Sequence, residues 1–335
     1  MKGFAVAGAA VVAAALSRPA FAGPNDLVLS RLGTCVAGGA ATADCANATD
    51  VIGSNIDFRS LSSELGVVLA PRLLTPADTL GFGGFQFTVD FQTTRIANDA
   101  PYWRVLEGSP NPGGAGVHHG DAYLPTVGFF ARKGLWMPLP SFEVGAGAVH
   151  LLDSNMWAAQ AYGKLALHEG YHDFPLPSAA IRGGVSRVMG TDQIDLTIAS
   201  LDVTLSKDFG YQGTVGVSPY GGWNLLWIVP RSEVIDKTPG IDVRDVPQDI
   251  DRNFAFKDQA NITRHRLFAG LKLQYYVFEM TLEAAFALAG SSVDDRAGTD
   301  VDCADVDPTA PTTRCDATDQ AAAQQSYTLS IGLDF

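Results

Sequence analysis

The chain ends on QQSYTLSIGLDF, residues 324–335, and this stretch decides the fold class. Side chains of a β-strand point alternately to its two faces. Here every second residue is apolar, and small or polar residues lie between: Tyr327, Leu329, Ile331, Leu333 and Phe335 form the apolar set. The segment therefore predicts a two-faced strand that ends in an aromatic residue.

The same alternation recurs along the chain, for instance in GFQFTVDFQT (residues 84–93) and VFEMTLEAAFAL (residues 277–288). Strands of soluble sandwiches usually have about five or six residues. These segments are longer, and period-two alternation over about ten residues is typical of a strand that crosses an outer membrane. We predict ten strands: 81–93, 122–133, 140–152, 155–168, 179–189, 193–207, 212–228, 261–276, 277–290 and 320–335.

The lengths of the connections test this assignment independently. In outer-membrane barrels the outer connections are long and the periplasmic turns are short. When strands are counted back from a periplasmic C-terminus, the three long connections, 94–121, 229–260 and 291–319, all fall at the outer end. The sequence thus predicts an all-β fold, a closed antiparallel transmembrane β-barrel of about ten strands over residues 81–335.

The N-terminus has the pattern of a signal peptide over residues 1–22. A basic residue, Lys2, precedes about 13 apolar residues, and Ala20-Phe21-Ala22 forms a small-x-small cleavage site. The run is short of the roughly 20 residues that a membrane-spanning helix needs. Removing Lys2 and Arg18 changes the formal net charge from −13 to −15. An acidic protein repels phosphates, so we expect no nucleic-acid partner.

Residues 23–80 precede the predicted barrel. SLSSELGVVLAPRLL (residues 60–74) predicts a short helix with Ser60 as its N-cap, ending before Pro71. We expect this N-terminal region to form a disulfide-closed loop and a short helix in or below the barrel, or a plug inside its lumen. Two further strands, which would make twelve in all, are the alternative.

The four cysteines form two pairs that are close in sequence, Cys35 with Cys45 and Cys303 with Cys315. Paired thiols in an exported chain favour disulfides. A four-cysteine zinc site is the alternative, but neither pair has the spacing of a zinc finger. We therefore predict both disulfides.

The closing segment resembles the C-terminal signature of Gram-negative outer-membrane β-barrel proteins, in which an alternating last strand ends in an aromatic residue. The matching residues are Tyr327, Leu329, Ile331, Leu333 and Phe335. The resemblance implies a location in the cell outer membrane. It also implies two partners, the membrane lipid and the barrel-assembly machinery, which would recognise these five residues as an assembly signal. It indicates no particular activity.

Polar and charged residues fall on the face of the predicted strands that would line the lumen. The predicted lumen residues are Gln86, Asp90, Glu143, Lys164, Arg182, Arg266, Lys272, Glu279 and Glu283. Eight strands enclose a space that side chains just fill, and the diameter grows with strand number. Opposite charges facing one another across ten strands would leave at most a narrow path.

Three motifs could carry metal chemistry, and each has a simpler interpretation. HEGYH (His168–His172) matches the zinc-protease pattern, but Gly170 and the prolines that follow prevent the helix which that site needs, so the simpler interpretation is a polar turn at the membrane interface. GVHHGD (Gly116–Asp121) is expected to be an exposed loop. DVDCADVD is a weak calcium candidate without EF-hand spacing, and its carboxylates are Asp300, Asp302, Asp305 and Asp307.

Enzymatic activity is not expected. The ten-stranded surface proteases use an Asp-x-His pair, and Asp-x-His does not occur in this chain. No catalytic residue, cofactor or firm metal site is predicted. The leading functional hypothesis is a passive channel or transporter for a small solute. The alternative is a closed structural or surface-binding barrel whose long outer loops contact a ligand.

Overall fold

The computed structural model describes residues 22–113, 116–119, 121–135, 141–170, 176–211, 214–239, 252–256, 259–294 and 318–335. Most of the predicted signal peptide lies outside this part of the chain. The predicted Cys303–Cys315 disulfide and the aspartates of the calcium candidate lie outside it as well. Among the described residues, no helix is both long and apolar enough to cross a membrane.

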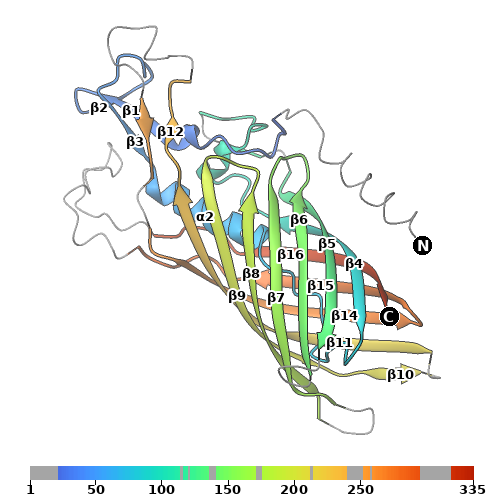
Figure 1. Cartoon of the computed structure of the whole chain (residues 1–335). Helices are drawn as coiled ribbons and strands as arrows, with labels where there is room; N and C mark the ends of the chain where they lie inside the picture. The colour runs from blue at the N-terminus through green and yellow to red at the C-terminus, as the bar shows by residue number, and fades with distance from the viewer. Residues whose placement is uncertain are drawn as a thin grey trace.

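Ten long antiparallel strands form the barrel (Figure 1). They are β4 (Phe85–Arg95), β5 (Tyr123–Leu135), β6 (Phe142–Leu151), β7 (Trp157–His168), β8 (Ser178–Met189), β9 (Ile194–Ser206), β11 (Val215–Ser232), β14 (Ile262–Tyr275), β15 (Phe278–Ala287) and β16 (Gln324–Asp334). The ring closes because β16 pairs with β4, while the short β10 (Phe209–Tyr211) continues the edge of β9 along β11. Each of the ten predicted spans overlaps one of these strands, so the predicted barrel is confirmed.

The region before β4 adds no strand to the barrel. It contains η1 (Leu29–Leu32), β1 (Gly33–Ala37), β2 (Ala40–Thr42), β3 (Asp50–Gly53) and the helix α2 (Asn55–Val68). β1 pairs with β2 and β3 in a separate three-stranded sheet. The alternative of twelve barrel strands is therefore wrong, since these short strands satisfy one another's backbone groups.

The two faces of the barrel strands differ as a membrane protein requires. β15 alternates strictly between exposed residues, such as Leu282 and Phe286, and buried ones, such as Glu279 and Glu283. Hydrocarbon cannot satisfy backbone N–H and C=O groups, so a sheet inside it must close on itself. A closed ring with an apolar outer surface and an aromatic-ended last strand is an outer-membrane β-barrel.

The connections define two ends. β14 and β15 are joined by the two-residue turn 276–277, whereas 96–122, 233–261 and 288–323 are long. Because long connections face outward in such barrels, the end that carries these three segments is the outer end. Phe335 then lies at the inner, periplasmic end.

The hydrophobic pattern inverts along β9. Toward the inner end the exposed residues are Leu201, Val203 and Leu205, whereas toward the outer end Ile194 and its alternate neighbours Leu196 and Ile198 are buried. Asp195 points outward there and forms an ion pair with Arg187 of β8. The outer end of this wall thus has the pattern of a water-soluble protein, so the hydrocarbon band covers only the inner and middle parts of the strands.

The chain before β4 runs through the barrel from its outer end to its inner end. Residues 23–54 contact outer connections: Leu27 pairs with Leu106, and Asn25 donates to the carbonyl of Asp153. α2 follows inside the ring, as Figure 1 shows, and an extended segment continues to the inner end, where the N–H of Gly134 bonds to Gly84. We call residues 55–80 the plug.

The predicted helix is present, but its start was misplaced. α2 begins after Ser54, whose hydroxyl accepts a hydrogen bond from the N–H of Asp57 at 3.3 Å. Ser60 lies within the helix and its hydroxyl accepts instead from the N–H of Gln320. The sequence misled because Asn55, Ile56 and Asp57 are weak helix formers, while Ser60 is followed by an apolar pattern that resembles a helix start.

The outer cap closes the outer end of the barrel. We define it as residues 23–54 together with η2 (Pro101–Val105) and the paired strands β12 (Ile235–Asp236) and β13 (Asn253–Phe254). The predicted Cys35–Cys45 disulfide is present in it, with 5.3 Å between the two Cα atoms. Lys237 donates to the carbonyl of Ser30 at 2.6 Å, and burial, with the nearby Arg104 charge, lowers the pKa of Lys237.

Candidate functional site

The nine residues predicted to line the lumen all lie on its wall. Eight of them are buried, and the side chain of the ninth, Lys272, is only 12% exposed. Instead of facing an aqueous path, most of them contact the plug or one another. The lumen filled by the plug is therefore the candidate site.

Basic and amide side chains of the wall donate to the backbone carbonyls of the plug. Gln160 donates to the carbonyls of Leu69 and Ala70 at 3.1 and 3.0 Å. Arg266 bonds to Pro71, and Arg182 to Leu73. Lys164 donates to the carbonyls of Pro76 and Asp78 at 3.2 and 2.8 Å.

Acidic and hydroxyl side chains accept from the plug's N–H groups. Glu283 accepts from Leu74 at 2.9 Å, Ser206 from Ala77 at 3.0 Å and Glu143 from Leu80 at 3.2 Å. The wall thus binds the extended segment 69–80 mainly through its main chain, as a peptide-binding groove binds a peptide. Such contacts fix the position of the chain while depending little on its side chains.

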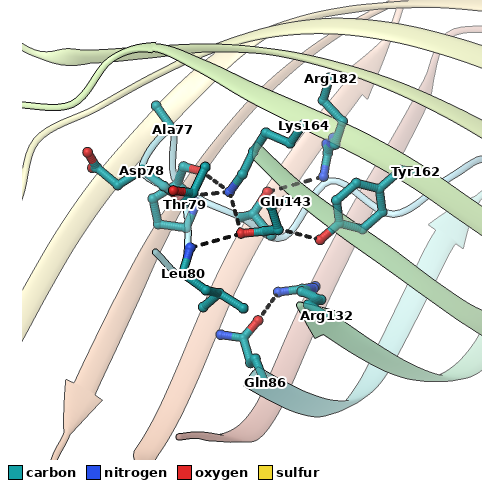
Figure 2. A network of polar contacts seen from close by, with 12 residues as sticks. Ala77, Asp78, Thr79, Leu80, Gln86, Arg132, Glu143, Tyr162, Lys164 and Arg182 are labelled. Atoms are coloured by element: carbon teal, nitrogen blue, oxygen red, sulfur yellow. Dashed lines mark hydrogen bonds and ion pairs between the residues drawn. The ribbon is translucent and has the colours of Figure 1, made fainter. Parts of the chain in front are cut away.

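Figure 2 shows the densest part of this network, around Glu143. The Glu143 carboxylate accepts from Tyr162 at 2.7 Å and pairs with Lys164 at 3.2 Å. Arg182 lies over the ring of Tyr162, 5.3 Å from its centroid, and pairs with Asp202 at 2.9 Å. Buried charges are tolerated only when they are paired and hydrogen-bonded. The ion pairs Glu143–Lys164 and Arg182–Asp202 meet the first condition, while Nη2 of Arg182 has no hydrogen-bond partner among the described residues.

The charges of the inner half of the lumen nearly balance. Arg72 of the plug and five basic wall residues face six acidic wall residues. The basic set is Arg132, Lys164, Arg182, Arg266 and Lys272, and the acidic set is Asp90, Glu143, Asp202, Glu279, Glu283 and Asp334. Asp78 of the plug, whose carboxylate accepts from Ser206 at 3.1 Å, adds one further negative charge. The lumen is therefore close to neutral and has little excess charge with which to attract an ion.

The outer half of the lumen is a hydrophobic core around α2 that also contains buried charged side chains, among them Glu64. Leu61 and Leu65 of the helix are fully buried with Ile198, Ile228 and Ile262 of the wall. Glu64 accepts four hydrogen bonds there, from Tyr102 Oη at 2.7 Å, Trp103 Nε1 at 2.8 Å, the Ala97 N–H at 3.1 Å and the Ala322 N–H at 3.0 Å. This carboxylate joins the plug to two outer connections.

Glu64 and its partners were not predicted. The helix prediction contained Glu64, but Tyr102 and Trp103 lie 38 and 39 residues away in a long connection. A signal for the apolar outer half was present in the sequence: the apolar parity of β9 changes between Ile198 and Leu201. That change marks where the inward face becomes apolar.

The predicted motifs lie away from this network or at its edge. His168 ends β7, and Glu169 accepts from the N–H and hydroxyl of Thr79 at 3.1 and 2.6 Å, while His172 lies outside the described residues. Glu169 therefore holds the plug in a turn, as the interpretation of HEGYH as a polar turn favours. In the described part of the chain, no group of three or more His, Cys, Asp or Glu side chains could hold a metal ion.

The five residues of the predicted assembly signal lie on the outer face of β16. Tyr327, Ile331 and Phe335 are exposed, and Leu329 and Leu333 are partly buried. At the inner end the N–H groups of Phe335 and Phe85 each bond to the other's carbonyl at 2.8 Å. The last residue thus closes the ring against the first barrel strand.

No family model matches the chain, and no curated protein matches it significantly. Solved structures similar to it include Ail, the attachment invasion locus protein of Yersinia pestis (11% identity, 76% of this chain and 99% of that chain, TM-score 0.26). The outer membrane protease OmpT from Escherichia coli matches at 10% identity over 77% and 99% of the two chains (TM-score 0.31). LpxR from Salmonella typhimurium matches at 9% identity over 72% and 99% (TM-score 0.29). At these TM-scores the likeness supports no conclusion about activity.

Proposed function

We propose that this outer-membrane barrel is closed to solutes and acts through its outer surface as a structural or surface-binding protein. The observation that supports this proposal is the plug, which fills the lumen along its length. From Phe58 to Ala77 every plug residue is buried. A barrel whose lumen is occupied in this way offers a partner outside the cell its outer end rather than its lumen.

The distribution of charge favours a basic partner. In the sequence, the segments at the outer end contain 23 acidic and eight basic residues, a difference of 15 that equals the whole net charge of residues 23–335. These segments are 23–54, 96–122, 152–156, 190–193, 233–261 and 288–323. Charge concentrated on one end of a protein steers partners of opposite charge toward it.

A channel that opens when the plug moves is the second candidate. Its support is that the wall binds segment 69–80 through polar contacts to the backbone, such as those of Gln160 and Lys164. Water could replace these contacts if the plug left. Leu69 and Ala70 belong to the main hydrophobic core. Apolar packing of the rest of the segment is slight, since Leu73 and Ala77 belong only to small clusters with wall residues.

Planar-bilayer conductance separates the two candidates. The full chain is compared with a variant whose plug is tethered, Ala77→Cys with Ala180→Cys, because these two residues lie in one buried cluster. A closed barrel gives no channel openings in either protein. Openings in the parent chain that disappear in the tethered variant, and return on reduction, would support the movable plug instead.

Surface binding is measured on the same preparations. Proteoliposomes containing the full chain should retain a fluorescent polylysine probe, and retention should fall as salt is raised. The matched variant changes Asp300, Asp302, Asp305 and Asp307 to Asn. Equal retention by the parent chain and this variant, or by the parent chain and protein-free liposomes of the same lipid, would contradict the role assigned to the outer acidic segments.

A further inference from the structure

We propose that the barrel binds one membrane lipid with an anionic headgroup, its acyl chain lying in a groove on the lipid-facing wall and its headgroup beside Arg95. The lipid-facing groove crosses β14, β15, β16 and β4 and has a volume of about 750 Å³. It lies on the outside of the ring, so this inference is independent of whether the lumen is open or closed.

The groove follows from the pairing register. At one level, Ala269 pairs with Ala284, Ala284 with Tyr327, and Thr93 pairs with both Tyr327 and Pro125. Apart from Tyr327, the side chains in this row are short. Longer side chains stand on both sides of the row: Leu271, Leu282, Leu329 and Phe91 toward the inner end, and Leu267 and Phe286 toward the outer end.

The groove faces the membrane, and this position favours a lipid acyl chain as its occupant. A second hollow of about 340 Å³ continues it toward the outer end, along Leu267, Ala284 and Phe286. Both hollows lie on the apolar face that the membrane covers, and their volumes fall in the range of small-molecule sites, about 300–1,000 Å³. Hydrocarbon gains no hydrophobic energy from leaving other hydrocarbon, so selectivity must come from close packing of the chain and from the headgroup.

Arg95 supplies the headgroup contact. It lies on the same outward face of β4 as Thr93 and two residues further toward the outer end, a rise of about 7 Å. It is exposed, it pairs in register with Tyr123, and no ion pair of Arg95 occurs within the described part of the chain. A cation at the membrane surface, one level above an apolar groove, matches a lipid that carries a phosphate above its chains.

Native mass spectrometry of the folded full chain, released from detergent, tests the proposal with phosphatidylglycerol and phosphatidylcholine of identical acyl chains. One basic residue near a membrane surface contributes about 1 kcal/mol toward anionic lipid, which corresponds to about fivefold in affinity. We expect the parent chain to retain one phosphatidylglycerol about fivefold more strongly than phosphatidylcholine.

Two variants separate the chain contact from the headgroup contact. Ala284→Phe fills the groove and should abolish retention of both lipids, whereas Ala161→Phe, at an exposed position on β7, should not. Arg95→Gln should lower retention of phosphatidylglycerol to that of phosphatidylcholine. Lys133→Gln removes the same charge at the inner end and should leave the preference unchanged. Ala269→Phe fills the groove from β14 if Ala284→Phe fails to fold.

Three outcomes would overturn the proposal. The first is equal retention of the two lipids by the parent chain. The second is equal retention by Ala284→Phe and Ala161→Phe. The third is a dimer of the parent chain that Ala284→Phe dissociates, which would make a second copy the occupant of the groove.

Discussion

Replacing Glu64 by Ala should destabilise the folded protein more than any other single change of a charged side chain in the plug. Glu64 is fully buried, and its carboxylate is the acceptor for Tyr102, Trp103, Ala97 and Ala322. The substitution leaves four donors without their acceptor in an apolar surrounding. It also removes these four bonds between α2 and the connections 96–122 and 288–323, although the bond between Ser60 and Gln320 remains.

The magnitude follows from those four donors. Each buried group left without a partner costs about 1–3 kcal/mol. We take the lower value because some donors can turn toward water. The four donors together then lower the free energy of unfolding by about 4 kcal/mol in Glu64→Ala. Glu64→Gln keeps one acceptor oxygen but turns an NH₂ group toward donors, so we expect its free energy of unfolding to fall by about 2 kcal/mol.

Urea unfolding in a fixed detergent, followed by tryptophan fluorescence, measures both values. Trp103 is fully buried and bonded to Glu64, so its emission reports the same contact. The control is Glu107→Ala, whose carboxylate is 45% exposed and pairs with Arg31 at 3.4 Å, and for which less than about 1 kcal/mol is expected. Equal stabilities of Glu64→Ala and Glu107→Ala would refute the idea that Glu64 joins the plug to the outer connections.

Four further outcomes are expected. A closed barrel resists mild detergent, so boiled and unboiled samples should migrate differently on gels, and native protein recovered in the soluble periplasmic fraction would contradict this. Opening the Cys35–Cys45 bridge by a double change to Ala should cost about 3 kcal/mol in the chain-entropy model, measured by urea unfolding. Unreduced peptide maps should recover Cys303 linked to Cys315, and free thiols there would disprove the pairing. Phe335→Asp should lower the amount of barrel in the outer membrane, while Phe335→Trp should lower it less because the interface preference survives. Normal levels of the Asp variant with altered binding would instead place Phe335 in a working site.

The barrel could be predicted from the sequence because its strands repeat one simple constraint. Every strand that crosses hydrocarbon must present apolar residues outward, so Leu282 and Phe286 stand in the same alternation as Leu329 and Ile331. The connection lengths then gave the orientation. Neither signal depends on contacts between distant residues.

The contacts of the plug could not be predicted from the sequence in this way. Its extended part, APRLLTPADTL (residues 70–80), has no period because it is bound through its backbone. The nine wall residues could be named from the parity of the strands, but the partners of Glu283 or Arg182 in the plug could not. Those partners depend on the depth to which residues 55–80 enter the ring, and a sequence pattern does not encode depth.

The order of events in assembly follows from where the ring closes. The plug joins β4 directly, and β4 makes one side of the β16–β4 seam, where Phe85 and Phe335 exchange backbone hydrogen bonds. Plug groups bond to side chains on β5, β7, β8, β14 and β15. If the plug entered a ring that had already closed, its polar groups would lose their hydrogen bonds to water before they could bond to the wall. If the seam instead closes around the plug, each hydrogen bond to water is replaced in turn by one to the wall. We therefore expect chains with Phe335→Asp, halted before closure, to expose residues 70–80 to protease, while the same segment stays protected in the inserted parent protein. Protection of this segment in the halted chains would mean that the plug enters after the seam has closed.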